Sequence, residues 1–310
     1  MSKKLNRQVI SEILIEEGKK DRDITVLCSD SSGSSSMTEF HKELPEQFVE
    51  VGIAEQNLVG IAAGLAACGK KSFAVSPACF LTTRSMEQVK VDVAYSGTNV
   101  KLIGVSAGVS YGPLGLTHHA VNDFATMASC PAMRVYCPSD QVTTKKLTYE
   151  LLGDTQGAYV RTGRIAFEPL YDEDVAFTMG KALTVCEGND AAVIACGDLV
   201  FEAKKAAELL AEEGIRVRVI DMYCIKPMDR EAVEAACRET GAIVTVEEHV
   251  AVGGLGAAVC QIAAETGGAR VRCMTLPDSP VIAGEEPDVL AYYGLNAEGI
   301  AKNVKEMLGK

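Results

Sequence analysis

Residues 48–65 read Phe-Val-Glu-Val-Gly-Ile-Ala-Glu-Gln-Asn-Leu-Val-Gly-Ile-Ala-Ala-Gly-Leu, and within them the sequence pattern changes from strand to helix. Residues 48–51 form a short, mostly apolar, β-branched run that predicts a strand, and Gly52 breaks it. From Ala54 onward the apolar residues recur with a helical period. Glycine is a poor helix former, so Gly60 and Gly64 inside this helix indicate close approach of another backbone.

Glu55 falls in the first turn of this predicted helix, just beyond the carboxyl end of the predicted strand. Open α/β sheets bind their ligands at this edge. A glutamate in a first helical turn also has an ordinary structural explanation, because it complements the helix dipole and stabilises the helix by about 0.3–1 kcal/mol. The pattern alone favours the structural explanation.

Composition places the chain among soluble globular proteins. Its 310 residues predict about two domains, and 47% apolar and 23% charged residues are ordinary values. No apolar run reaches the roughly 18 residues of a membrane-spanning helix, and the polar start lacks a signal peptide's apolar core. We therefore expect a cytoplasmic protein, and the net charge of −12 argues against a nucleic-acid or membrane partner.

Metal and disulfide chemistry have little support in the sequence. The eleven cysteines are scattered without a Cys-x-x-Cys pair, and most lie among apolar residues. Buried, reduced thiols are the better expectation. His118 and His119 are adjacent, but no Asp or Cys accompanies them at metal-ligand spacing, so a zinc site is not expected.

Short apolar runs alternate with helical patterns along the whole chain. Predicted strands cover residues 24–28, 48–51, 72–76, 100–106, 133–136 and 158–161, and then 191–196, 215–220 and 242–246. Predicted helices cover residues 7–17, 85–96, 140–151, 199–213 and 229–239, besides those that start at 54 and 255. Residues 77–84 are expected to form a loop. This alternation predicts an α/β fold of two doubly wound domains with mostly parallel sheets. We place the first domain at residues 1–168, a linker at 169–188 and a smaller second domain at 189–310.

Two loops are candidates for binding an anion. Residues 29–36 form a serine-rich loop directly after a strand. A flexible turn is the ordinary explanation, yet backbone amides and hydroxyls in such a loop can converge on an anion. Gly253-Gly-Leu-Gly256 opens a predicted helix but lacks the spacing of a dinucleotide fingerprint, so it is a weak phosphate signal.

The run Val-Gly-Ile-Ala-Glu-Gln-Asn-Leu at residues 51–58, followed by Gly-Ile-Ala-Ala-Gly-Leu-Ala at 60–66, resembles the pyrimidine-binding domain of thiamine-diphosphate enzymes. The nearest members are transketolases, especially those split into two polypeptides, and 1-deoxyxylulose-5-phosphate synthase. The resemblance covers nearly the whole chain, and implies a pyrimidine-binding domain followed by a transketolase C-terminal domain. In that family, the glutamate matching Glu55 hydrogen-bonds the cofactor's aminopyrimidine and activates it, which requires a carboxyl in a dry pocket.

The same resemblance implies further cofactor contacts. Phe80-x-x-x-Arg84 is similar to the segment in which family members stack an aromatic ring on the pyrimidine, and Phe80 offers the flat face that stacking needs. A plain core position for Phe80 remains open. Asp30 and Arg84 are the other expected cofactor-binding residues.

Residues 112–119, Gly-Pro-Leu-Gly-Leu-Thr-His-His, resemble the family's Gly-(Glu/Ala)-Asp-Gly-x-Thr-His-Gln loop. The resemblance implies that His118 is catalytic and binds substrate, with His119 beside it where the family has Gln. Leu114 stands where transketolases carry an Asp that recognises a sugar hydroxyl. Loss of a buried acceptor changes discrimination between substrates that offer or lack that hydroxyl, so the sugar remains open.

A phosphate site is implied by four further matches. Arg164, with Arg161 as second choice, matches the strand end where the family places a phosphate-binding arginine. Arg7 and Ser34 match two more positions that hold the acceptor phosphate. Guanidinium and hydroxyl groups suit a dianion, although each arginine taken alone is also explained as a surface charge.

The chain lacks the Gly-Asp-Gly and later Asn that signal the family's diphosphate and metal site. We therefore expect no metal ligands here, and an N-terminal partner subunit that holds the diphosphate and Mg²⁺. The implied activity is a thiamine-diphosphate-dependent transketolase, moving a two-carbon ketol unit between sugar phosphates in a dimer of two-chain units. Alternatives are a 1-deoxyxylulose-5-phosphate synthase, which is usually one longer chain, the beta subunit of a 2-oxo acid dehydrogenase, or a non-catalytic scaffold.

Overall fold

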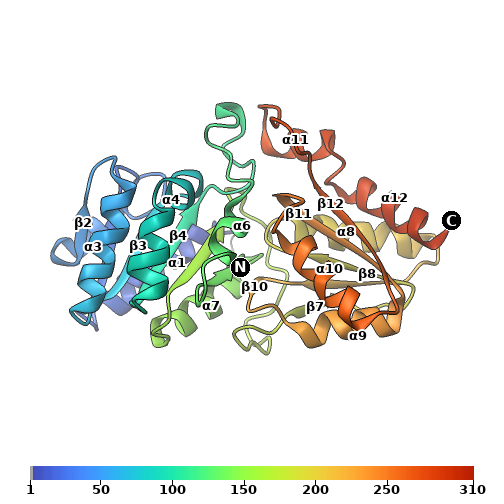
Figure 1. The fold of residues 1–310 in the computed structure, drawn as a ribbon, viewed down its shortest axis with the longest axis horizontal. Coiled ribbons are helices and arrows are strands. Elements are labelled where there is room, and N and C mark those ends of the chain that lie inside the picture. The colour runs from blue at the N-terminus through green and yellow to red at the C-terminus, as the bar shows by residue number, and fades with distance from the viewer. Residues whose placement is uncertain (1–2) are drawn as a thin grey trace. The chain divides into compact units, whose positions relative to one another are not determined.

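The computed structural model describes residues 3–310, which group into two compact units (Figure 1). The first unit contains residues 3–107 and 126–175, and the second contains residues 108–125 and 176–310. Residues 108–125, which include both adjacent histidines, therefore pack with the C-terminal part of the chain. No helix within residues 3–310 is long and apolar enough to cross a bilayer.

The first unit is built around a parallel sheet. Its elements are α1 (Asn6–Gly18), β1 (Ile24–Cys28), α2 (Thr38–Glu43), η1 (Pro45–Gln47), β2 (Phe48–Glu50), α3 (Glu55–Ala67), β3 (Lys71–Pro77), α4 (Ala78–Arg84), α5 (Met86–Gln88), η2 (Val89–Tyr95), β4 (Val100–Val105), α6 (Asp123–Ala128), β5 (Arg134–Tyr136), α7 (Gln141–Gly153) and β6 (Ala158–Thr162). Helix α6 begins in residues of the second unit and ends in residues of the first. Its strands run in the order β5-β6-β4-β3-β1-β2, and every pairing is parallel. Strands β1, β4 and β6 are buried at every residue, as expected for strands covered on both faces.

Strand order places a ligand-binding edge in this unit. Strand β1 lies between β2 and β3, so the chain leaves β1 toward one side and later returns on the other. Such a switch in direction opens a crevice at the carboxyl ends of the strands. The loops after β1, β2 and β3 all begin at this edge, and they hold the serine-rich loop, Glu55 and Phe80 respectively.

Residues 77–84 contain helix α4 in place of the expected loop, and the predicted helix over residues 85–96 is broken into α5 and the π-helical turn η2. In this segment the hydroxyls of Thr82, Thr83 and Ser85 each donate to the carbonyl four residues earlier. Side chains that bond back to the backbone in this way disturb a helix. Periodicity alone does not report these competing bonds.

The second unit has a smaller sheet of mixed direction. Its remaining elements are η3 (Gly112–Leu114), β7 (Leu183–Cys186), β8 (Ala191–Ala195), α8 (Leu199–Glu212), β9 (Val217–Asp221), β10 (Cys224–Lys226), α9 (Arg230–Thr240), β11 (Ala242–Val250), α10 (Leu255–Thr266), β12 (Arg270–Leu276), α11 (Glu286–Tyr292) and α12 (Ala297–Leu308). The strand order in this sheet is β12-β11-β8-β9-β7. Edge strand β7 pairs antiparallel with β9, whereas β12 with β11, β11 with β8 and β8 with β9 pair in parallel. The two doubly wound α/β units confirm the predicted fold class.

Helix α3 carries its glycines on an open face. Gly60 is half-buried and Gly64 is exposed, and a β carbon placed on Gly64 would meet no atom within 4 Å. The close backbone approach that the sequence predicted is therefore not made at Gly64 by the described residues. Large apolar side chains are exposed nearby on α3 and η2, with Ile61 38% and Tyr95 88% accessible.

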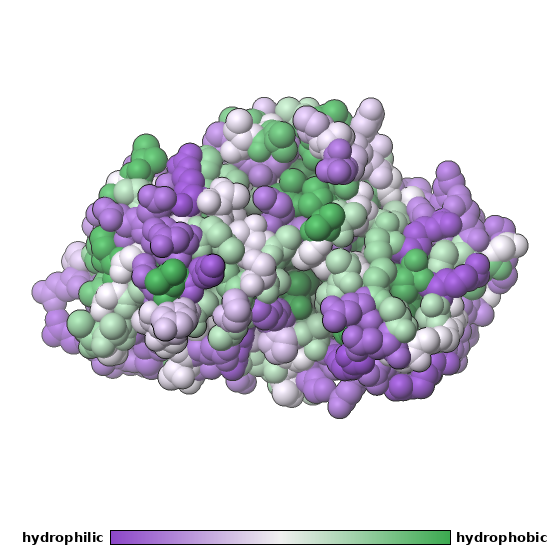
Figure 2. Space-filling model, viewed as in Figure 1, coloured by the Kyte–Doolittle hydropathy of each residue, from purple (hydrophilic) through white to green (hydrophobic). Residues whose placement is uncertain are grey.

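Other apolar surface residues are dispersed. Figure 2 shows hydrophobic residues interspersed with hydrophilic ones over the visible face of the molecule. Single exposed apolar side chains are normal on a soluble protein and need no partner to explain them.

Candidate active site

Glu55 is a buried carboxyl of the first unit, at the start of a helix. Strand β2 ends at Glu50, and Gly52 turns the chain with a φ of +71°, a conformation that favours glycine. Helix α3 then begins at Glu55, which is only 4% exposed. The backbone amides at this helix terminus favour a negative charge, which helps a carboxylate to persist in a buried place.

Arg84 connects Glu55 with Phe80. Its Nη1 atom donates to both carboxylate oxygens of Glu55 at 3.0 Å. Its guanidinium carbon lies 3.9 Å from the centroid of the Phe80 ring, one helical turn earlier on α4. Gln56 donates to the Arg84 carbonyl at 3.1 Å and so links α3 to α4. Three of the residues predicted to bind cofactor are thus brought together.

An open pocket of about 590 Å³ lies beside this group. It is lined by Ile53, Ala54, Glu55, Gln56, Asn57 and Arg84. Ile53 is 75% exposed at its rim. The pocket therefore combines a buried carboxylate, a cation and an apolar edge at the start of one helix.

The serine-rich loop is ordered by its own hydrogen bonds. Asp30 adopts a left-handed φ of +52°, and its amide donates to Glu50 Oε1 at 2.7 Å. Ser34 donates its hydroxyl to the Ser31 carbonyl at 3.1 Å. Buried Ser29 and Ser76 share a hydrogen bond of 2.8 Å across β1 and β3. A flexible turn is therefore the wrong description of this loop, although Asp30 itself is exposed.

The predicted phosphate-binding arginines lie near the carboxyl ends of β4 and β6. Arg7 is buried, and its Nη1 donates to the Gly163 carbonyl at 3.3 Å. Arg164 is exposed and donates to Ser106 Oγ at 3.1 Å. Arg161 is buried in β6 itself. The guanidinium groups of Arg7 and Arg164 therefore lie at the ends of these adjacent strands, a suitable arrangement for an anion.

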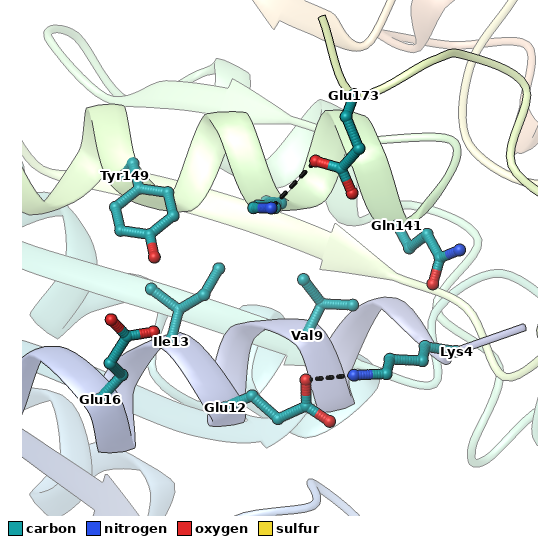
Figure 3. A pocket seen from close by; sticks show the side chains of 9 residues that line it. Lys4, Val9, Glu12, Ile13, Glu16, Gln141, Tyr149 and Glu173 are labelled. Atoms are coloured by element: carbon teal, nitrogen blue, oxygen red, sulfur yellow. Dashed lines mark hydrogen bonds and ion pairs between the residues drawn. The ribbon is translucent and has the colours of Figure 1, made fainter. Parts of the chain in front are cut away.

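A second pocket in the first unit, of about 410 Å³, has different chemistry (Figure 3). Side chains of α1 and α7 face one another across it. Its lysines are already engaged, Lys4 with Glu12 at 2.6 Å and Lys145 with Glu173 at 2.9 Å. Paired surface charges and the apolar floor of Val9 offer no reactive group, so this pocket is not a catalytic candidate.

His118 and His119 lie in a turn of the second unit rather than in a strand, and their environments differ. His118 is half-buried, with Nδ1 3.0 Å from Thr117 Oγ1 and its ring edge-on to Tyr111. His119 is buried, and its Nε2 donates to the Gly112 carbonyl at 3.2 Å. Burial lowers the pKa of His119, which favours the neutral ring. His118 is therefore the more accessible of the two.

Strand β11 holds the loop that carries these histidines. The Val109 amide donates to Glu248 Oε2 at 3.2 Å, and the Ala125 amide donates to His249 Nε2 at 3.3 Å. The Val250 amide donates to the Val121 carbonyl at 2.9 Å. The sequence analysis missed Glu248 and His249. The available signal was the polar sequence Glu-Glu-His at the end of an otherwise apolar strand.

The glycine-rich start of α10 already holds an anionic group from the same unit. The amides of Leu255 and Gly256 both donate to the buried carboxylate of Glu247 at 2.7 Å. A β carbon on Gly254 would lie 2.2 Å from Glu247 Oε2. The motif therefore serves to seat Glu247, which removes the support for a phosphate site there.

The comparisons with known proteins agree along the whole chain. The family model described as "Transketolase, pyrimidine binding domain" matches residues 2–168, and "Transketolase, C-terminal domain" matches residues 180–300. A subunit of an apulose-4-phosphate transketolase from Phocaeicola vulgatus is 47% identical, over 98% of this chain and 97% of that protein. Human transketolase is 34% identical, over 98% of this chain and 49% of its own length.

A solved structure titled "Split gene transketolase, inactive beta4 tetramer" aligns with a TM-score of 0.89 and 35% identity, covering 98% of each chain. The family models, the relatives and this solved fold agree on the family. The chain belongs to the transketolase family and carries that family's pyrimidine-binding and C-terminal domains.

Proposed function

We propose that this chain is the C-terminal subunit of a two-chain transketolase, which transfers a two-carbon ketol unit between sugar phosphates. The observation that carries the proposal is the buried Glu55 carboxylate at the start of α3, beside an open pocket. A buried carboxyl can exchange a proton with a ring nitrogen at a fixed position. Surface carboxylates elsewhere on the chain lack this setting.

The residues of this site fit the aminopyrimidine of thiamine diphosphate. Glu55 offers the hydrogen-bonding carboxyl, and Phe80 offers an aromatic face close to it. When bound, the cofactor supplies the reactive carbon that carries the two-carbon unit. Glu55 would hold the proton at its Oε atoms, and the pocket wall would orient the ring. To admit the aminopyrimidine, Arg84 would either share the Glu55 carboxylate with that ring or turn away from the carboxylate.

For substrate, we propose that Arg7, Arg161 and Arg164 hold the anionic end and that His118 hydrogen-bonds the sugar. Arg161 lies in β6, Arg7 donates to the Gly163 carbonyl just after β6, and Arg164 donates to Ser106 just after β4, which suits a phosphate. On the ordered loop after β1, Ser34 remains a proposed substrate contact and Asp30 a proposed cofactor contact. His119 is better suited to support the loop, because its burial and its bond to Gly112 keep it from solvent.

The sugar class follows from Leu114. This side chain is 55% exposed in the His118 loop, so no acceptor is available at that position. We propose a branched or deoxy sugar with an anionic end. Two relatives support this class by their names, the apulose-4-phosphate transketolase subunit at 47% identity and a "6-deoxy-6-sulfo-D-fructose transketolase" subunit of a Clostridium species at 35%.

We also propose that an N-terminal partner subunit supplies the diphosphate and Mg²⁺ site. No group of three or more His, Cys, Asp or Glu side chains that could hold a metal occurs within residues 3–310. The exposed Ile53 beside Glu55 suits burial by another chain. The split transketolase of known structure is described as an inactive tetramer of beta chains, which supports an assembly that needs a second subunit for activity.

Purification of this chain alone, of its candidate partner alone and of the two co-expressed would test the proposal. We expect ketol transfer and tight, magnesium-dependent binding of thiamine diphosphate only in the co-expressed pair. Calorimetry and product analysis by mass spectrometry would measure both. Tight binding and full activity of the single chain would contradict the assignment of the diphosphate site to a partner.

A further inference from the structure

Two thiols from separate segments of the second unit are in contact. The sulfurs of Cys260 on α10 and Cys273 on β12 are 3.5 Å apart. Cys260 is half-buried and Cys273 is exposed. A disulfide needs a sulfur separation of about 2.05 Å, so the two atoms must approach by about 1.5 Å. Side-chain rotation within two neighbouring elements supplies movements of this size.

The fold leaves space for this contact. Cys273 pairs in register with Thr245 of β11, so its position on the sheet is fixed. Gly256 lies one helical turn before Cys260 on α10. A β carbon on Gly256 would lie 2.8 Å from the Cys273 sulfur, which is too close for a side chain. The glycine therefore gives Cys273 the room in which it reaches Cys260.

The other thiols differ in their accessibility. Cys28, Cys79 and Cys224 are buried, and burial raises the pKa of each to about 12. Burial also raises the pKa of Cys260 to about 11, with its contact to Cys273 as the second cause. Thiol reagents react with the accessible thiolate. Within the pair, a reagent from solvent therefore meets the exposed Cys273 before the half-buried Cys260.

We propose that Cys260 and Cys273 form a dithiol modification site, which a low-molecular-weight disulfide oxidises to an intramolecular disulfide. The Cys273 thiolate attacks one sulfur of the small disulfide, which forms a mixed disulfide and releases one small thiol. Cys260 then loses its proton and attacks the Cys273 sulfur, which releases the second small thiol. Two protein thiols are oxidised, and one small disulfide is reduced to two thiols.

The new bond joins α10 to β12. Both elements lie in the second unit, and α10 packs directly on β12. The first turn of α10 also seats the Glu247 carboxylate, so the bond restrains the helix on which that carboxylate depends. The site and its chemistry are independent of the proposed transketolase activity.

Oxidised glutathione is a suitable probe, with the full chain as purified and again in the co-expressed pair. We expect the chain to lose two of its eleven thiols, and its mass to fall by about 2 Da. Peptide mapping without reduction should recover a peptide pair joined through Cys260 and Cys273. Reaction should speed up as the pH rises toward 11, because the resolving step needs the Cys260 thiolate.

Single serine variants separate the two steps. Cys260→Ser should accumulate one glutathione on Cys273, whereas Cys273→Ser should lose the internal disulfide and react more slowly. Cys68→Ser, which removes another exposed thiol, should behave like the wild type. Peptide mapping of the oxidised wild-type chain needs no variant, so it still tests the proposal if a variant fails to fold. Absence of the Cys260–Cys273 peptide pair after oxidation, or loss of two thiols from Cys273→Ser at the wild-type rate, would overturn the proposal.

Discussion

At the scale of single residues, Arg84 is the side chain that contacts both Glu55 and Phe80. Its guanidinium hydrogen-bonds both oxygens of Glu55 and lies over the Phe80 ring. A flat cation thus makes the two contacts, carboxylate and ring, that we propose for the aminopyrimidine. The Arg84 side chain is 46% exposed but that of Glu55 is 5% exposed, so turning Arg84 toward solvent leaves a buried carboxylate that needs another donor.

Glu55→Gln tests the proposed proton role. The variant keeps the size of the side chain but cannot exchange a proton, so we expect turnover of the two-chain enzyme to fall at least about tenfold with little change in apparent substrate affinity. Circular dichroism and sedimentation should match the wild type. Glu39→Gln, at an exposed carboxylate on α2, is the control and should retain full turnover. If Glu55→Gln retains more than roughly a tenth of wild-type turnover, Glu55 serves only to stabilise the start of the helix.

Leu114→Asp tests the substrate class. A new acceptor in the His118 loop should shift the ratio of kcat/KM values toward ordinary pentose phosphates, by an amount set by one hydrogen bond, about 1–3 kcal/mol. Leu116→Asp places the same charge at a neighbouring exposed leucine of that loop and should leave the ratio unchanged. Competition between the two sugar classes in one assay measures the ratio directly. An unchanged ratio in Leu114→Asp would refute the assignment.

Lys101 is a buried cation with a structural role. Its Nζ donates to Asn99 Oδ1 and to the carbonyls of Asp154 and Gln156 at 2.6–2.9 Å. Lys101→Met removes the donor from three acceptors, so we expect a loss of about 2–4 kcal/mol in the free energy of unfolding. Urea denaturation measures it, and Lys302→Met, at an exposed position of α12, should change stability by less than about 0.5 kcal/mol.

The Lys101 prediction has a pH dependence. Burial lowers the pKa of Lys101 from 10.5 to about 8 in the folded chain. Between these values the unfolded chain binds more protons, so the Lys101 contribution to stability rises with pH. It is complete above the unfolded value and is lost as pH falls through about 8. The stability gap between wild type and Lys101→Met should therefore widen by up to about 3 kcal/mol from pH 8 to pH 10.5. A difference in the free energy of unfolding that stays constant over this pH range would contradict the prediction.

At the scale of elements, strand β11 supports the His118 loop of the second unit. Consecutive residues at its end serve different purposes. Glu247 seats the first turn of α10, Glu248 accepts from the Val109 amide, and His249 accepts from the Ala125 amide. The His118 loop therefore depends on β11 for its position.

Glu248→Ala should loosen that loop. We expect faster amide hydrogen exchange across residues 108–125 and a higher KM for substrate, because the Val109 amide loses its acceptor. Glu248→Gln keeps an acceptor oxygen and should recover most of the affinity. Glu208→Ala, at an exposed site on α8, is the control. Unchanged exchange in Glu248→Ala would show that the carboxylate does not hold the loop.

At the scale of the whole molecule, the outer face of α3 is the surface most suited to another chain. It combines exposed glycine with exposed apolar side chains, including Ile61 and Tyr95 on the neighbouring η2. Small residues allow a second backbone to approach closely, and the apolar side chains gain from burial. The same helix begins with Glu55, so an assembly on this face would cover the pocket.

Ile61→Glu should weaken assembly while leaving the fold intact. A charge buried in an interface without a partner is costly, so we expect sedimentation to show smaller species at micromolar concentration, with or without the partner subunit. Leu209→Glu is a matched control, because Leu209 is 39% exposed on α8 and Ile61 is 38% exposed on α3. Identical sedimentation of Ile61→Glu and wild type would exclude this face as the interface.

Much of the fold could be predicted from the sequence because strand and helix periods are local. A strand was predicted at residues 100–106, and β4 lies there, between β3 and β6. The strand, turn and helix around Glu55 were also correctly anticipated. The broken helix after β3 was not, because side-chain hydroxyls competing for backbone carbonyls leave the apolar period unchanged.

The sequence by itself determined that Glu55 would begin a helix after a strand, and its resemblance pointed to Phe80, Arg84 and His118. Only the tertiary structure decided that Arg84 joins Glu55 to Phe80, that the His118 loop rests on Glu248 and His249, and that the Gly253–Gly256 amides hold Glu247. These contacts join residues up to 139 positions apart. Local periodicity reports which face of an element is buried, whereas the partner of a polar side chain is chosen by packing between distant elements.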